Sequence, residues 1–183
     1  MNAGRIGLVA AVYFAACGLL PASGWAQSGA TAPPEINTKP IGKVLSVAGV
    51  AHIEHPAAVV VQANLSTGDT PTKVGDLVYR GDVIQTGADG SLSITFADGT
   101  SFNVSNNAKM EVNDFIYDPN GHSNSSLMSL TKGTFTFIAG NVAHTGDMKV
   151  TTPVGTMGIR GTAPRVEILD DGTVKFSTLV EQK

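Results

Sequence analysis

The segment Ser91-Leu92-Ser93-Ile94-Thr95-Phe96-Ala97-Asp98-Gly99-Thr100-Ser101-Phe102-Asn103-Val104 carries the clearest structural signal in this chain of 183 residues. Polar and apolar residues alternate on both sides of Asp98-Gly99, as they do in strands with one buried face. An Asp-Gly pair between two such runs predicts a two-residue type I′ hairpin turn, which needs positive φ at both positions. The residues on the predicted buried face are Leu92, Ile94, Phe96, Phe102 and Val104.

Similar stretches continue outward from this hairpin in both directions. From Ile41 onward, alternating segments are separated by Gly, Asp and Asn at intervals of roughly 8–12 residues, a spacing typical of small all-β domains. Asp89-Gly90 and Asp171-Gly172 predict further hairpin turns. No segment shows a convincing helical period, and 105–114 fits one helical turn or a strand equally well. Expected strands cover 42–47, a second strand from Val50, 126–130, 134–138, 148–151, 164–168 and 174–176, with a buried strand or inserted hairpin within 56–65.

These patterns predict one all-β domain over residues 41–180, built from short, mostly antiparallel strands and hairpins. The length of the chain fits a single domain with a sizeable core. A β-sandwich or roll agrees with the even spacing of strands and turns, and a β-solenoid-like arrangement is the alternative.

Composition excludes several classes of protein. The chain has 12 basic and 15 acidic residues, a net charge of −3 and no basic block, which argues against nucleic acid as a partner. Its single cysteine excludes a disulfide-built miniprotein and a cysteine-rich zinc module. Only one apolar run is present, so a protein with several membrane spans is excluded as well.

Residues 1–26 have the pattern of a secretory signal peptide, with Arg5 before an apolar run and cleavage expected after Ala26. The run from Ile6 to Leu20 is shorter than the roughly 20 residues that a spanning helix needs. A retained anchor and a lipoprotein signal at Cys17 are the alternatives. After cleavage we expect no membrane span and no cysteine, a flexible tether over 27–40, and a periplasmic, secreted or cell-surface location.

Residue types suited to catalysis or metal binding do not form a familiar pattern. On a strand, His52 and Glu54 share one face and His55 points the other way, so the three do not form a metal site. The loop Asp118-Pro119-Asn120-Gly121 lacks the bidentate glutamate of a calcium loop. No G-x-S-x-G elbow occurs. We therefore expect no enzyme activity, no catalytic residue, no metal and no cofactor.

Three segments follow one another in a characteristic order: 75–87 (GDLVYRGDVIQTG), 93–100 (SITFADGT) and 150–162 (VTTPVGTMGIRGT). In this order they resemble the FecR domain, and the lead-in 42–50 is similar to the opening hairpin of that family. The resemblance covers roughly residues 42 to 170. It implies that the site residues are the motif positions, in structural or recognition roles: Gly81, Asp82, Thr86, Asp98, Gly99, Thr152, Pro153, Ile159, Arg160, Gly161 and Thr162.

The function that the resemblance implies has to be adapted to this sequence. The full sensor-regulators of the family combine a cytoplasmic anti-sigma segment, one membrane span and a periplasmic FecR domain, and they relay an iron–siderophore signal. Here the expected signal peptide and tether use up the 40 residues before the domain. We therefore expect a non-catalytic exported envelope protein that binds or scaffolds other envelope proteins, or senses a signal. The alternatives are a regulatory component of iron uptake signalling and an adhesin-like surface module.

Arg160 is the motif residue whose role the sequence leaves most open. Its guanidinium could bind an external anion or ligand carboxylate, or it could pair with an internal carboxylate such as Asp82 or Asp98. The neighbouring Thr-Pro and Gly-Thr elements are typical of turns, and this favours the internal pair.

Overall fold

The computed structural model describes residues 39–55, 70–161 and 164–178. The expected signal peptide, most of the tether, the segment 56–65 and Thr162 lie outside these residues. Within them the chain forms strands and one short helix: β1 (Gly42–Ala48), β2 (Ala51–Glu54), β3 (Leu77–Val78), β4 (Val83–Thr86), β5 (Ser91–Phe96), β6 (Ser101–Val104), β7 (Lys109–Ile116), β8 (Asn124–Ile138), α2 (Asn141–Thr145), β9 (Gly146–Thr152), β10 (Gly155–Ile159), β11 (Pro164–Ile168) and β12 (Val174–Thr178).

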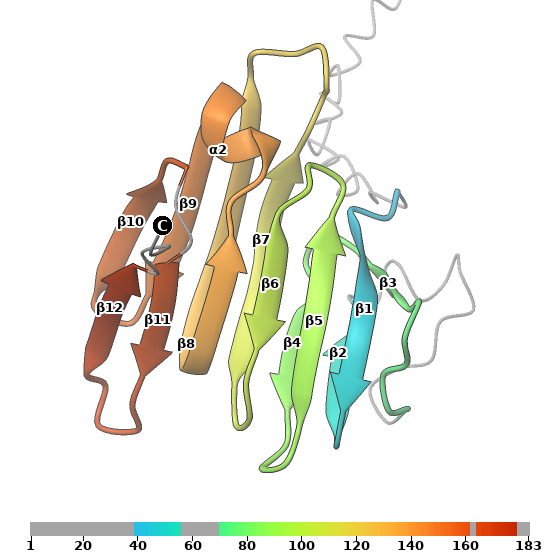
Figure 1. The fold of residues 1–183 in the computed structure, drawn as a ribbon, viewed down its shortest axis with the longest axis vertical. Helices are drawn as coiled ribbons and strands as arrows, with labels where there is room; N and C mark the ends of the chain where they lie inside the picture. The colour runs from blue at the N-terminus through green and yellow to red at the C-terminus, as the bar shows by residue number, and fades with distance from the viewer. Residues whose placement is uncertain (1–38, 56–69, 162–163, 179–183) are drawn as a thin grey trace, which may run out of the picture. The chain divides into compact units, whose positions relative to one another are not determined.

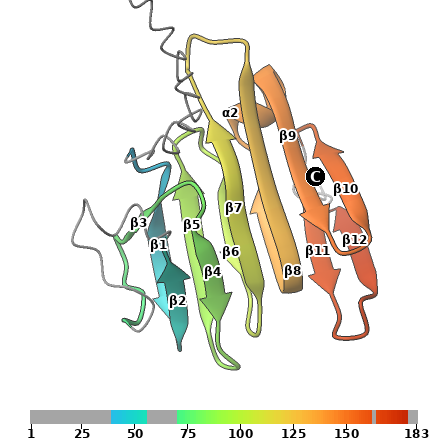
Figure 2. The same ribbon diagram turned by 180° about the vertical axis from the view of Figure 1, so that it is seen from behind.

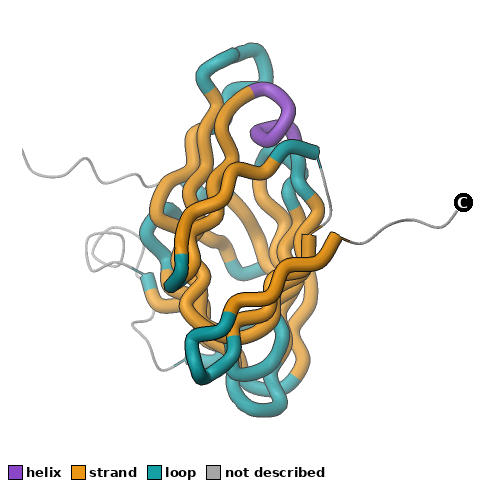
Figure 3. Tube along the Cα trace, turned by 90° about the vertical axis from the view of Figure 1, so that its left-hand side faces the viewer, coloured by secondary structure: helices purple, strands orange, loops and turns teal. Residues whose placement is uncertain are grey.

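The strands form one continuous sheet that folds over into two facing layers (Figures 1 and 3). The first layer has the order β3-β1-β5-β6-β8-β11-β12, and the second has the order β2-β4-β7-β8-β9-β10. All pairings are antiparallel except that of β8 with β9, which is parallel. The all-β prediction is confirmed.

Strand β8 belongs to both layers and joins them (Figure 2). Its first half pairs with β7 and β9, and its second half pairs with β6 and β11. The buried positions are even-numbered up to Leu130 and odd-numbered from Phe135, so the inward face changes in between. Gly133 lies at this change with φ +100, a conformation that glycine adopts without the steric cost of a Cβ. The two strands predicted at 126–130 and 134–138 are therefore one strand.

The predicted opening hairpin over 42–50 is wrong. Strand β1 pairs with β3 and β5 in the first layer, whereas β2 pairs with β4 in the second. The hairpin turn predicted at Asp89-Gly90 is also wrong, because the chain passes there from β4 in the second layer to β5 in the first. The segment between β1 and β2 passes between the layers in the same way. The two crossings lie against each other: a Cβ on Gly49 would come within 2.3 Å of the Asp89 carbonyl oxygen, and one on Gly90 within 2.0 Å of the Val50 carbonyl oxygen. Alternation predicts strands but not their partners.

The hairpin at Asp98-Gly99 is confirmed, with Ile94 opposite Phe102. Its turn differs from the prediction. The N–H of Phe96 donates to the Thr100 carbonyl, and among the turn residues only Gly99 has positive φ, at +87. These features are those of a three-residue hairpin loop and not of a type I′ turn. The turn at Asp171-Gly172 links β11 to β12 as predicted, and it has the same three-residue form.

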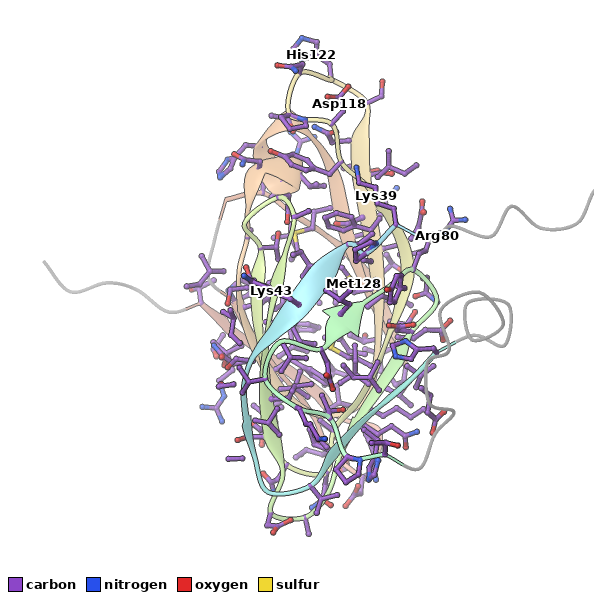
Figure 4. The ribbon with its side chains drawn as sticks, turned by 90° about the vertical axis from the view of Figure 1, so that its right-hand side faces the viewer. Lys39, Lys43, Arg80, Asp118, His122 and Met128 are labelled. Carbon is purple, nitrogen blue, oxygen red and sulfur yellow. The ribbon has the colours of Figure 1, made fainter. Side chains whose placement is uncertain are left out.

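The core lies between the layers and is lined by the aromatic residues of the strands. Phe102 stacks on Phe137 with ring centroids 4.6 Å apart, and Phe96 contacts both Phe102 at 5.9 Å and Phe115 at 5.5 Å. Met128 lies in this interior, whereas Arg80 and His122 lie at the margin (Figure 4). All five residues predicted on the inner face of the first hairpin are buried.

Helix α2 is an element that the sequence analysis missed. Its five residues follow Gly140, whose position leaves no room for a side chain because a Cβ there would come within 2.3 Å of the Thr100 backbone nitrogen. In the described part of the chain, no helix is long and apolar enough to cross a membrane.

Candidate functional site

Asp82 is a buried anchor at the point where the chain passes from β3 to β4. Its side chain is fully buried, and one carboxylate oxygen accepts the Tyr79 N–H at 2.8 Å. The other oxygen lies 3.0 Å from Nδ1 of His55, which follows β2. The backbone carbonyl of Asp82 accepts the N–H of Val112 on β7. Asp82 therefore ties together three segments that are distant in the sequence.

The His55 ring stands at the edge of a cavity of about 330 Å³. It also packs edge-on against the Tyr79 ring, with centroids 5.7 Å apart. Burial raises the pKa of Asp82 above its ordinary value of 3.8, although the hydrogen bonds from His55 and from the Tyr79 N–H oppose this effect. The cavity is lined by Ile53, His55, Thr70, Pro71, Thr72, Lys73, Gly75, Asp76 and Leu77.

The raised pKa of Asp82 gives stability a pH dependence with a definite sign. Because the pKa of Asp82 is higher in the folded state than in the unfolded state, the protonated carboxyl favours folding. The stability that it contributes is fully present below the unfolded-state pKa and is lost as the pH rises through the folded-state pKa. Asp82→Asn keeps an oxygen for the Tyr79 N–H but carries no charge. We expect the melting temperature of this variant, relative to wild type, to increase between about pH 4 and about pH 7 in thermal melts.

The control for this experiment is Asp114→Asn, because Asp114 is a half-exposed carboxylate that lies 3.5 Å from Arg80 at the surface. It should show no comparable trend. A difference between Asp82→Asn and wild type that stays constant over the same pH range contradicts the assignment.

Asp98 holds helix α2 against the first hairpin. It is 1% exposed, and its carboxylate accepts the N–H and the hydroxyl of Thr100 and the N–H of Val142. Its backbone carbonyl accepts the N–H of Asn141, and the Thr100 hydroxyl accepts the N–H of Gly140. The motif Asp98-Gly99-Thr100 is therefore a structural junction between the β5–β6 turn and the start of α2.

Four other motif residues also serve the fold. Thr86 donates its hydroxyl to the Ser105 carbonyl at 2.6 Å and accepts the Ala108 N–H at 2.9 Å. Thr152 donates to the Gly155 carbonyl at 3.0 Å and so closes the β9–β10 turn. Ile159 is buried at the end of β10. Gly81 has φ +88 at the turn before Asp82, which agrees with the predicted turn role.

The predicted internal pair between Arg160 and Asp82 or Asp98 is wrong. Both carboxylates are buried and bonded to other groups, whereas Arg160 is exposed just after β10 and forms no ion pair with any described residue. The motif thus divides into two sets. Its buried polar groups bind other groups of the fold, and its exposed members are Gly99 in the β5–β6 turn and, around the β9–β10 hairpin, Pro153, Arg160 and Gly161.

Metal-ligating side chains are not gathered into a cluster in the described ranges. No group of three or more His, Cys, Asp or Glu side chains there lies close enough to hold a metal ion. Glu54 accepts a hydrogen bond from Gln85, and His55 contacts Asp82 instead of joining His52 and Glu54. The importance of His55 had no signal in the sequence, because its partner lies 27 residues away.

Comparison with known proteins gives one match. A family model described as "FecR protein" matches residues 82–180, which include the Asp82 anchor, the Asp98 junction and the β9–β10 hairpin. No curated protein and no solved structure matches the chain. Since this match spans more than half of the sequence, the chain belongs to the FecR family.

Proposed function

We propose that this chain is a non-catalytic, exported protein of the cell envelope whose FecR domain binds another envelope protein. The FecR family is a regulatory and signalling family associated with iron–siderophore uptake, and its proteins are associated with the membrane and envelope. The signal-peptide pattern of residues 1–26 supports export.

The observation that carries the proposal is the exposed guanidinium of Arg160. The other charged residues of the motif, Asp82 and Asp98, are occupied by contacts within the fold. Arg160 is exposed and has no ionic partner among the described residues. A guanidinium presents five donors in a planar fork that fits a carboxylate. The binding partner is therefore expected to offer a carboxylate to the β9–β10 hairpin.

The test is capture of partners from an envelope fraction under mild crosslinking. Wild-type protein should retain at least one envelope protein, and Arg160→Ala should lose most of it while melting at the same temperature as wild type. Arg165→Ala is the matched control, because Arg165 is an exposed arginine on β11 outside the motif. Failure of the wild type to retain any partner, or equal retention by Arg160→Ala, would count against the proposal.

A second candidate is a regulatory component of iron–siderophore uptake that works with a separately encoded membrane partner. The family match favours it, since FecR proteins are associated with this signalling. Deleting the gene should then change iron-responsive transcription. Unchanged transcription in iron-poor and iron-rich medium would remove the support for this candidate.

A further inference from the structure

Strand β12 is the outer strand of the first layer and is poorly covered. It pairs with β11 on one side and with no other described strand. Four of its five residues are exposed, and these include Phe176, which is 51% exposed. The register places Phe176 opposite Val166, so both side chains point to the same face, and Val166 is 0% exposed. Burial of the inward face therefore decreases across β12, where Val174 is half-buried and Phe176 is exposed.

An edge strand of this kind has unpaired backbone donors and acceptors that another strand can use. We infer that β12 pairs antiparallel with β12 of a second copy of this chain. The axis of this pairing passes through Phe176, so that Phe176 of one copy lies directly opposite Phe176 of the other. Aromatic residues directly opposite each other stabilise antiparallel pairs. The inference uses no contact of Arg160 and does not rest on the proposed function.

The residue pattern selects this register. A shift of one residue would place the inward Phe176 opposite the outward Ser177, which reverses the faces of the second copy. Centring the pair on Lys175 would place two lysines directly opposite each other, which is unfavourable. In the register centred on Phe176, Lys175 instead lies opposite Ser177 of the second copy, and Glu167 of its own β11 is its neighbour on the other side.

The same register continues the apolar face across both copies. Along the central row, Val166 and Phe176 of one copy meet Phe176 and Val166 of the other. In the adjacent row, Ile168 and Val174 continue into Thr178 and Pro164 of the second copy. No charged residue lies on this inward face. The pairing involves short strands and less area than the roughly 1,600 Å² of a standard interface, so we expect a weak, concentration-dependent dimer.

Light scattering over a wide concentration range, up to the millimolar level, tests the dimer with the exported protein. The wild type should pass from monomer to dimer as its concentration rises, and Phe176→Lys should stay monomeric. The matched control is Ile138→Lys, since Ile138 is an apolar residue on β8 with 59% exposure, and this variant should dimerise like wild type. A wild type that is monomeric throughout, or a Phe176→Lys variant that dimerises equally, overturns the inference.

Crosslinking tests the register and leaves Phe176 in place. In chains with Cys17→Ser, we would make Lys175→Cys and Ser177→Cys separately and oxidise each alone and as a mixture. These two positions lie opposite each other in the inferred pair, at the Cβ separation of about 4.5–5.5 Å of cross-strand neighbours. Disulfide-linked dimers should form in the mixture far more than in either variant alone. Equal crosslinking in all three samples, or none in the mixture, contradicts this arrangement.

Discussion

Replacing Phe96 with alanine is expected to lower the free energy of unfolding by about 3–5 kcal/mol, because a large buried side chain leaves a cavity behind. Phe96 is 3% exposed and contacts aromatic rings in both layers, Phe102 beside it on β6 and Phe115 on β7 of the facing layer. The loss is a large part of the roughly 5–15 kcal/mol that stabilises a typical domain. Urea denaturation measures it, and most of the exported variant should be degraded in cells.

The same chain supplies a matched control in Phe176→Ala. Phe176 is an aromatic residue on a strand of the same layer, but it is half exposed, so its removal leaves little cavity. Measured at low protein concentration, where the monomer prevails, this variant should lose much less stability than Phe96→Ala. Similar losses for the two variants would show that Phe96 does not link the layers.

Replacing Gly133 with alanine is the second substitution with a large expected effect. A Cβ at this position would lie 2.4 Å from the Ala108 Cβ and 2.5 Å from its Cα, so backbone must move. The positive φ of +100 adds strain for any residue with a Cβ. Left-handed conformation costs roughly 1–2 kcal/mol and overpacking about 1–3 kcal/mol. We therefore expect the free energy of unfolding to fall by about 2–5 kcal/mol, measured by urea denaturation.

Gly172→Ala separates these two contributions. Gly172 has φ +82 in the β11–β12 turn, and no atom lies within 4 Å of the position of its Cβ. This variant carries the conformational strain without the steric contact, so it should lose only about 1–2 kcal/mol. If Gly133→Ala lost no more stability than Gly172→Ala, the close contact with Ala108 would not be what requires glycine at the point where β8 passes between the layers.

The alternation of residues from Ser91 to Val104 was sufficient to predict a hairpin and its buried face. Side-chain direction along a strand is a local property with a period of two, so it can be read from adjacent residues. The same reasoning predicted β11, β12 and the turn between them. It did not find helix α2, because five residues are too few to show a helical period and the helix is held by Asp98, more than 40 residues earlier in the chain.

The motif also gave a partial account of the candidate site. It singled out Asp82 and Asp98, and both are buried in the structure. It could not identify His55 as the partner of Asp82, nor show that Arg160 faces outward. Residue type shows that a carboxylate or a guanidinium needs a partner, whereas the choice of partner depends on which segments the fold brings within hydrogen-bonding distance.

The sequence alone was sufficient to predict the fold class, most strand-forming segments, most of the inward-facing residues and the resemblance to the FecR family. The tertiary structure was needed to show that β1 and β2 lie in different layers, that β8 passes between them at Gly133, and that Arg160 forms no ion pair with a carboxylate of the described residues. The reason is physical. Alternation fixes which side of a strand is apolar, but many pairings bury the same side chains, and the choice among them rests on close backbone contacts between segments far apart in the chain.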